Sequence, residues 1–270
     1  MGSGSSRLRA YGGAGRYTAR MRLALNARRQ DALPRFDIFT ITIGREHYLP
    51  AQLDHLQRAR RQFGRHLLVA NGCELSRGLR RRLRRLGSEI ITTERTTAGG
   101  CIERLKPLLG ASHAMKLDDD AIPIGDDFFA HMRSLVGLLP DHVLSPYPVG
   151  LVKNPGGPRL AEGEAHRVVF APGTDTYYTL RPVRHMGGLA RVAPRACYDL
   201  LRFSSTQQTD DADFARALRA AGVPMCYVEN GAVVEHAETV WGQRQRDPAY
   251  WQDKQQGLRA LGTAEPPASG

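Results

Sequence analysis

Three consecutive aspartates, Asp118, Asp119 and Asp120, follow a short segment at 114–117 that we expect to form a strand. Adjoining carboxylates repel one another, so their ionisation at a strand end is costly unless a cation neutralises them. Oxygen ligands of this kind suit Mg²⁺ or Mn²⁺, and such an ion can bridge the oxygens of a diphosphate. The triplet therefore predicts a metal and diphosphate site, and the alternative is an acidic loop that caps a helix at 124–136.

The segments before the aspartates alternate between strand and helix patterns, which predicts an α/β fold. Apolar runs indicate strands at 36–43, 66–70, 89–93 and 114–117, and helices are expected between them at 50–63, 77–86 and 100–109. Such alternation is typical of a mostly parallel sheet with right-handed crossovers, whose ligand lies at the carboxyl ends of the strands.

The alternation is lost after Pro123. There we expect strands at 168–171 and 176–180, a turn and helix at 191–203, a helix at 210–221, and a last strand at 225–228 before the segment 233–236. With 270 residues and 41% hydrophobic content, the chain suits one large domain or a core with a small lobe. We expect a basic extension with a tag-like start at 1–34 and a flexible tail at 257–270.

The chain is strongly basic, with a formal net charge of +11 and a pI near 9.9, which favours an anionic partner. Part of the excess lies at 77–86, where leucines recur at helical spacing and arginines fill the other face. This face could contact anionic lipid or an acidic acceptor, or could simply be solvated.

Two further features bear on location. No apolar run reaches the roughly 18 residues of a membrane-spanning helix. The four cysteines, Cys73, Cys101, Cys197 and Cys226, lack Cys-x-x-Cys spacing and are expected to be reduced thiols. We therefore expect a cytoplasmic protein, with peripheral contact at the inner face of an anionic membrane as an alternative.

The order of these parts resembles that of GT-A fold glycosyltransferases, most of all glycosyltransferase family 2, over about residues 36–236. The resemblance rests on Thr42 and Arg45, on the motifs at 69–72, 117–120 and 209–216, and on His236. It implies a Rossmann-like, mostly parallel central sheet flanked by helices, with a smaller acceptor-side lobe. Residues 35–121 would form the nucleotide-sugar-binding half and residues 122–256 the acceptor-binding and catalytic half of the same domain.

The resemblance also implies a metal site. Asp120 would be the direct ligand, Asp118 would contact the ribose or the metal with its water, and Asp119 would lie beside the donor. His236 would complete the site, and because imidazole suits Mn²⁺ better than Mg²⁺, manganese is favoured. Glu235 or Glu238 could substitute for His236 as a ligand, and the other alternative is that His236 is purely structural.

Further positions correspond to donor contacts in the family. Asn71 resembles the residue that reads the nucleobase, since an amide offers a donor and an acceptor, although Asn71 and Gly72 could form only a turn. Thr42 and Arg45 would lie beside the base and diphosphate. Gly187 and Gly188 resemble the loop that borders the donor sugar, and Arg104 resembles a basic donor contact.

The pair Asp210 and Asp211 resembles the Glu-Asp pair that supplies the catalytic base in this family. Matching the motif assigns the base to Asp211, although Asp210 stands where the family has glutamate. The alternative is an ordinary acidic first turn of a helix. The Gln-x-x-Arg-Trp signature of processive relatives is absent around Trp241, so we expect one sugar per binding event.

Taken together, these features predict metal-dependent, inverting transfer of one sugar from a nucleoside diphosphate, UDP being favoured. The acceptor would be a hydroxyl of a glycan, a lipid-linked or a phosphorylated compound. A nucleotidyltransferase is one alternative, although only Gly44 and Arg45 stand where its glycine-rich loop would be. A non-enzymatic, basic nucleic-acid-binding protein is another, but it leaves the acidic triplet unexplained, so nucleic acid is not favoured.

Overall fold

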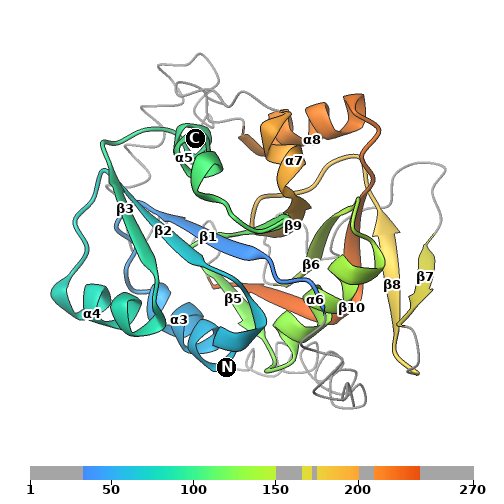
Figure 1. The fold of residues 1–270 in the computed structure, drawn as a ribbon, viewed down its shortest axis with the longest axis horizontal. Helices are drawn as coiled ribbons and strands as arrows, with labels where there is room; N and C mark the ends of the chain where they lie inside the picture. Colours follow the sequence, from blue (N-terminus) through green and yellow to red (C-terminus); the bar gives the residue numbers. More distant parts are fainter. Residues whose placement is uncertain (1–32, 150–165, 172–174, 201–209, 238–270) are drawn as a thin grey trace, which may run out of the picture.

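The computed structural model describes residues 33–149, 166–171, 175–200 and 210–237 (Figure 1). The tail at 257–270, Trp241 and all but the last two residues of the extension at 1–34 lie outside these ranges. Within them, one mixed sheet of ten strands runs through the centre of the molecule.

The first half of the chain forms the parallel part of the sheet, in the order β3-β2-β1-β4. Apolar segments make the buried strands β1, β2 and β4, while β3 is partly exposed, and a helix after each of β1, β2 and β3 returns the chain to the same edge. The strands are β1 (Asp37–Thr42), β2 (His66–Asn71), β3 (Glu89–Thr93) and β4 (His113–Leu117). The connections hold α3 (Leu49–Arg58), η1 (Arg60–Gln62), α4 (Arg77–Leu86), α5 (Ala98–Leu105) and η2 (Lys106–Leu108).

The second half continues the sheet from β4 in the order β9-β6-β10-β8-β7, and β5 pairs with β10. The pairing here is antiparallel except between β10 and β6. The strands are β5 (Ala121–Ile124), β6 (Val143–Val149), β7 (Arg167–Phe170), β8 (Tyr177–Pro182), β9 (Ala190–Pro194) and β10 (Met225–His236). The helices are α6 (Phe128–Leu138), α7 (Arg195–Asp199) and α8 (Asp210–Ala220). The α/β class and the parallel first half are as the sequence predicted.

Three details of the second half differ from expectation. Residues 191–194, expected as the start of a turn and helix, lie in β9 beside β4, and neither β5 nor β6 was expected. The final strand runs without a break from Met225 to His236, with a register shift between Val228 and Val233. Proline and charged residues in β6 and β9 hide the apolar pattern of buried strands.

Helices cover both faces of the sheet (Figure 1). On one face, α3, α4 and α6 pack into a core that contains Leu53, Leu83 and Leu135. On the other face, α5, α7 and α8 pack into a second core that contains Ile102 and Phe214. The described helices are all too short or too polar to cross a membrane.

Candidate active site

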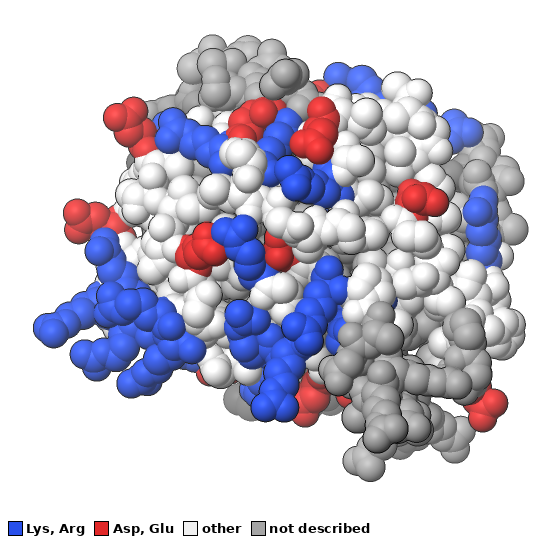
Figure 2. Space-filling view, viewed as in Figure 1, with Lys and Arg blue, Asp and Glu red and all other residues white. Residues whose placement is uncertain are grey.

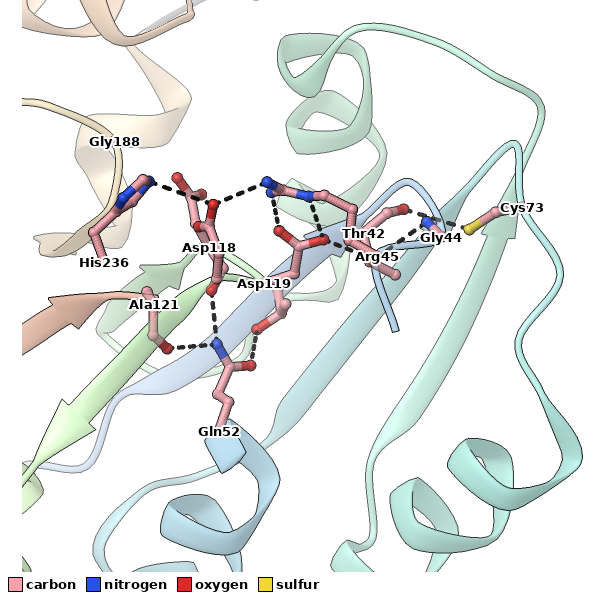
Figure 3. A network of polar contacts seen from close by, with 12 residues as sticks. Thr42, Gly44, Arg45, Gln52, Cys73, Asp118, Asp119, Ala121, Gly188 and His236 are labelled. Carbon is pink, nitrogen blue, oxygen red and sulfur yellow. Dashed lines mark hydrogen bonds and ion pairs between the residues drawn. The ribbon is translucent and has the colours of Figure 1, made fainter. Parts of the chain in front are cut away.

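The three aspartates form the turn between β4 and β5, at the carboxyl edge of the parallel strands (Figure 3). Gln52, a fully buried residue of α3, donates from its amide to the carbonyl of Asp118 at 2.7 Å and to that of Ala121 at 2.9 Å. The turn is therefore held by its backbone, which leaves the carboxylates available for other contacts. Sequence analysis did not single out Gln52.

The end of β10 brings His236 to this turn. In the antiparallel pairing of β10 with β5, His236 lies opposite Ala121, and the amide of Ala237 donates to the carbonyl of Asp120 at 2.8 Å. As a result, Nε2 of His236 lies 3.5 Å from Oδ2 of Asp120. The structure thus brings together the two side chains from which a metal site was expected.

Asp119 points in the opposite direction and anchors the turn to β1 (Figure 3). The hydroxyl of Thr42 donates to Asp119 at 2.8 Å, and the guanidinium of Arg45 binds Asp119 and also reaches Asp120 at 2.9 Å. Asp119 is 1% exposed. Arg45 therefore offsets part of the negative charge of the acidic turn, and Thr42 adds a hydrogen bond to it.

The environment separates the three carboxylates by their acidity. Burial raises the pKa of Asp118 to about 7, against the attraction of Lys116, and raises that of Asp119 to about 6, against the attraction of Arg45. Burial also opposes ionisation of Asp120, but hydrogen bonding from His236 and the charge of Arg45 outweigh it and lower its pKa to about 2. Asp120 is therefore the aspartate that remains ionised most readily.

The chemistry of Asp120 and His236 fits a divalent cation. Two neighbouring ligands of an octahedral ion lie about 3 Å apart, because each bond is about 2.1 Å long, and the observed 3.5 Å is close to this separation. Nδ1 of His236 is buried and has no hydrogen-bond partner among the described residues. No group of three possible His, Cys, Asp or Glu ligands occurs in the described ranges.

Asp211 lies in the first turn of α8, on the other side of Asp118. Its Oδ1 accepts a hydrogen bond from Nη1 of Arg191 at 2.6 Å and lies 3.7 Å from Nζ of Lys116. Burial would raise the pKa of Asp211, but the charges of Lys116 and Arg191 lower it to about 2, so the carboxylate is ionised at neutral pH. The side chain of Asp210 lies outside the described residues.

The loop that contains Gly187 and Gly188 lies against Lys116 and Asp211. The carbonyl of Gly188 accepts from Nζ of Lys116 at 3.1 Å, and the amide of Gly187 donates to the hydroxyl of Tyr227 at 3.0 Å. A Cβ atom on Gly188 would lie 2.6 Å from Nζ of Lys116 and would also collide with the carboxylate of Asp211. Only glycine lets the loop approach this closely.

Two expected donor residues lie apart from the acidic turn. The amide of Asn71 donates to the carbonyl of Thr96 at 2.7 Å and accepts from the amide of Thr96 at 2.8 Å, so both its groups hold a loop. Recognition of the nucleobase by Asn71 stays a prediction, with the turn as its alternative. Arg104 is exposed on α5, and among the described residues no hydrogen bond or ion pair links it to the aspartates.

Lys116 and Arg191 are the site residues that sequence analysis missed. Both are charged residues inside buried strands, β4 and β9, with exposed fractions of 5% and 0%. A buried charge requires a partner, so a cation within the apolar strand expected at 114–117 was a signal for Lys116. Arg191 gave no such signal, because its segment was expected to form a turn and helix.

No known protein family and no curated protein matches the chain in sequence. Solved structures do match its fold. Residues 1–349 of TarS from S. aureus, in complex with UDP-GlcNAc, match with a TM-score of 0.55 and 12% identity over 76% of this chain. The match spans 58% of that TarS chain, which is less than two thirds of it.

Two other structures give similar values. The mannosyltransferase PcManGT from Pyrobaculum calidifontis, in complex with GDP-Man and Mn²⁺, matches with a TM-score of 0.57 and 16% identity over 96% of this chain and 73% of its own. A mycobacterial protein matches with a TM-score of 0.54 and 12% identity over 80% of this chain and 73% of its own. The chain therefore has the GT-A fold of glycosyltransferases, as its sequence led us to expect.

Proposed function

We propose that this chain is a glycosyltransferase that moves one sugar from a UDP-linked donor to an acceptor hydroxyl. The observation that carries the proposal is the meeting of three groups at one edge of the sheet, namely the acidic turn, His236 and Asp211. In this proposal residues 35–121 bind the nucleotide sugar, and residues 122–256 form the acceptor side of the same domain.

The donor diphosphate is proposed to lie over Asp118 and Asp120. Asp120 and His236, with Asp118 beside them, would hold Mn²⁺ or Mg²⁺, which when bound would stabilise the negative charge of the leaving diphosphate. Arg45 contacts Asp119 and Asp120 and offers a planar group for bidentate contact with phosphate oxygens.

The remaining donor contacts follow from the loops around the turn. Gly187 and Gly188 would let the backbone lie against the sugar. Asn71 is proposed to lie beside the nucleobase, and its amide also holds the backbone of Thr96. Arg104 remains a prediction that only a donor complex can test.

Asp211 is proposed as the base of an inverting reaction. The acceptor oxygen would attack the anomeric carbon on the face opposite the diphosphate, and the bond from that carbon to the diphosphate oxygen would break. The electron pair would leave with the nucleoside diphosphate, and the hydroxyl proton would pass to the carboxylate of Asp211. An ionised carboxylate is required for this, and Lys116 and Arg191 keep Asp211 ionised.

An anionic membrane surface is the proposed site of the acceptor. Figure 2 shows basic side chains gathered over α4, whose leucines Leu79, Leu83 and Leu86 are buried in the core. On this helix the side chains of four exposed arginines have no hydrogen-bond or ion-pair partner among the described residues: Arg77, Arg81, Arg84 and Arg85. Because no apolar side chain of α4 faces outward, the contact would be electrostatic and peripheral.

The proposal can be tested by measuring the thermal unfolding of the full chain with UDP and GDP sugars, with and without Mn²⁺. A ligand that binds only the folded state raises the midpoint, and we expect the largest rise with a UDP sugar plus Mn²⁺. The reaction products are then analysed with the donor that gives the largest rise. Release of nucleoside diphosphate supports the proposal, whereas release of pyrophosphate from a nucleoside triphosphate would identify a nucleotidyltransferase instead.

A further inference from the structure

Lys116 and Arg191 are directly opposite each other in the ladder between β4 and β9, in the interior of the sheet. Opposite residues of an antiparallel pair point to the same face and lie about 5 Å apart, and like charges in such a pair are destabilising. Both cations are buried, so solvent does not screen their repulsion. The pair therefore requires carboxylates close by.

Two carboxylates from different elements meet this requirement. Asp211 of α8 lies 2.6 Å from Nη1 of Arg191 and 3.7 Å from Nζ of Lys116. Asp118 of the acidic turn lies 3.0 Å from Nζ of Lys116 through its Oδ1. Lys116 contacts both carboxylates, and its third contact, to the carbonyl of Gly188, leaves it little freedom to turn.

Stability alone is a poor account of this arrangement. Replacing a buried ion pair by apolar side chains of similar volume is often neutral or stabilising, so burial of these charges need not favour folding. The cluster also lies between the two carboxylates to which separate roles in transfer are proposed. Its position indicates that the geometry of Asp118 relative to Asp211 is what it maintains.

We propose that Lys116 is a positioning residue, which fixes Asp118 on the donor side against Asp211 on the acceptor side. This inference rests on the proposed function. Lys116 would thereby set the distance between the sugar held near the acidic turn and the carboxylate that takes the acceptor proton. Arg191 orients Asp211 through their ion pair.

The test compares Lys116→Met, Lys116→Gln and Lys116→Arg in the full chain. Misplacement of reacting groups by about 1 Å costs roughly 100-fold in rate, so we expect kcat of the Met and Gln variants to fall by about that factor. Donor binding, measured by calorimetry, should change by no more than about threefold, because Asp120, His236 and Arg45 remain in place. Lys116→Arg should recover part of kcat, since it restores a cation at the same place.

The matched control is Arg65→Met, which removes a cation from an ion pair with Glu89 at the opposite end of β2. Its kcat should stay within about twofold, because partly exposed pairs contribute little. Folded Met and Gln variants with wild-type kcat would overturn the inference, and so would a loss of folding in both, which would make the role structural. A wild-type protein that uses no nucleotide sugar would instead refute the proposed function.

Discussion

Nε2 of His236 lies 3.5 Å from Oδ2 of Asp120, although the two residues come from the last described strand and from the middle of the chain. The contact depends on the pairing of β10 with β5, which places the end of one strand beside the start of the other. An imidazole and a carboxylate at this separation are suited to share one cation.

Replacing either residue should weaken metal binding. Asp120→Ala should abolish the stabilisation by UDP sugar that requires Mn²⁺, and with it donor hydrolysis and transfer. His236→Ala should lower Mn²⁺ affinity by at least about 10-fold, the loss typical even for groups that only orient a ligand. Calorimetric titration with Mn²⁺ in the presence of UDP measures both. Asp126→Ala, which removes an exposed aspartate paired with Arg58, serves as the control, and equal affinities in all three variants would contradict the assignment.

Asp211→Asn should separate binding from turnover. The amide cannot take a proton, so kcat should fall by a factor of roughly 100 to 10,000, the contribution typical of a general base. Loss of the charge also leaves Lys116 and Arg191 with less compensation, so the unfolding midpoint should fall as well. Turnover at saturating donor is measured below that midpoint, with donor binding as the internal check. A variant that binds donor and retains wild-type kcat would exclude Asp211 as the base.

Gly188→Ala should disrupt the site and lower stability. A Cβ atom there would lie 2.6 Å from Nζ of Lys116, so the loop or the ion cluster must move, at a cost of about 1–3 kcal/mol. Gly187→Ala is a matched control for stability, because its Cβ would meet the hydroxyl of Tyr227 at an ordinary 3.7 Å. Urea unfolding of both variants gives the comparison. The reading of this close approach is wrong if the two variants unfold alike.

Acid should destabilise the fold through two buried histidines. Burial lowers the pKa of His66 to about 3 and that of His131 to about 4, so both side chains stay neutral in the folded state. In the unfolded chain a histidine has a pKa of about 6.5, so both take up a proton below that pH. Stability is therefore lost as the pH falls from about 6.5 towards these values, by about 2 kcal/mol per histidine between pH 7 and pH 5. Urea unfolding at the two pH values measures this loss. In His131→Gln the loss should be smaller by one such increment, and an unchanged pH dependence would refute the contribution of His131.

The arginines of α4 should control binding to anionic vesicles. Arg81→Gln, Arg84→Gln and Arg85→Gln together should reduce partition onto vesicles that contain phosphatidylserine by roughly 100-fold, since each arginine near such a surface contributes about 1 kcal/mol. A variant with Arg35→Gln, Arg167→Gln and Arg216→Gln has the same net charge and should bind nearly as the wild type does. Co-sedimentation with vesicles, with neutral phosphatidylcholine as the blank, decides between them. Equal loss in both variants would mean that overall charge, and not α4, governs binding.

The parts of the site that the sequence predicted are those that lie in local patterns. The triplet Asp118 to Asp120 follows a strand directly, and chain order alone places it at the carboxyl edge of a parallel sheet. His236 could be proposed only through the resemblance, because its approach to Asp120 depends on a pairing between distant strands.

The parts that were missed depend on tertiary contacts. The meeting of Lys116 and Arg191 depends on the pairing of β9 with β4, which no local pattern indicates. Gln52 looks like a polar position of an amphipathic helix, yet it is fully buried and holds the acidic turn. For Asn71 the local motif was recognisable, but it did not indicate that the side-chain amide forms hydrogen bonds with the backbone of Thr96.

The central place of β10, between β6 and β8, has a consequence for how the protein is made. Domains tend to fold from the amino terminus during synthesis, and contacts between distant segments form late. A nascent chain that has emerged only through β4 and β5 already carries the aspartates but lacks their imidazole partner. The proposed capture of a cation by Asp120 and His236 together would therefore await insertion of β10, by which time the ribosome has synthesised nearly all of the described residues.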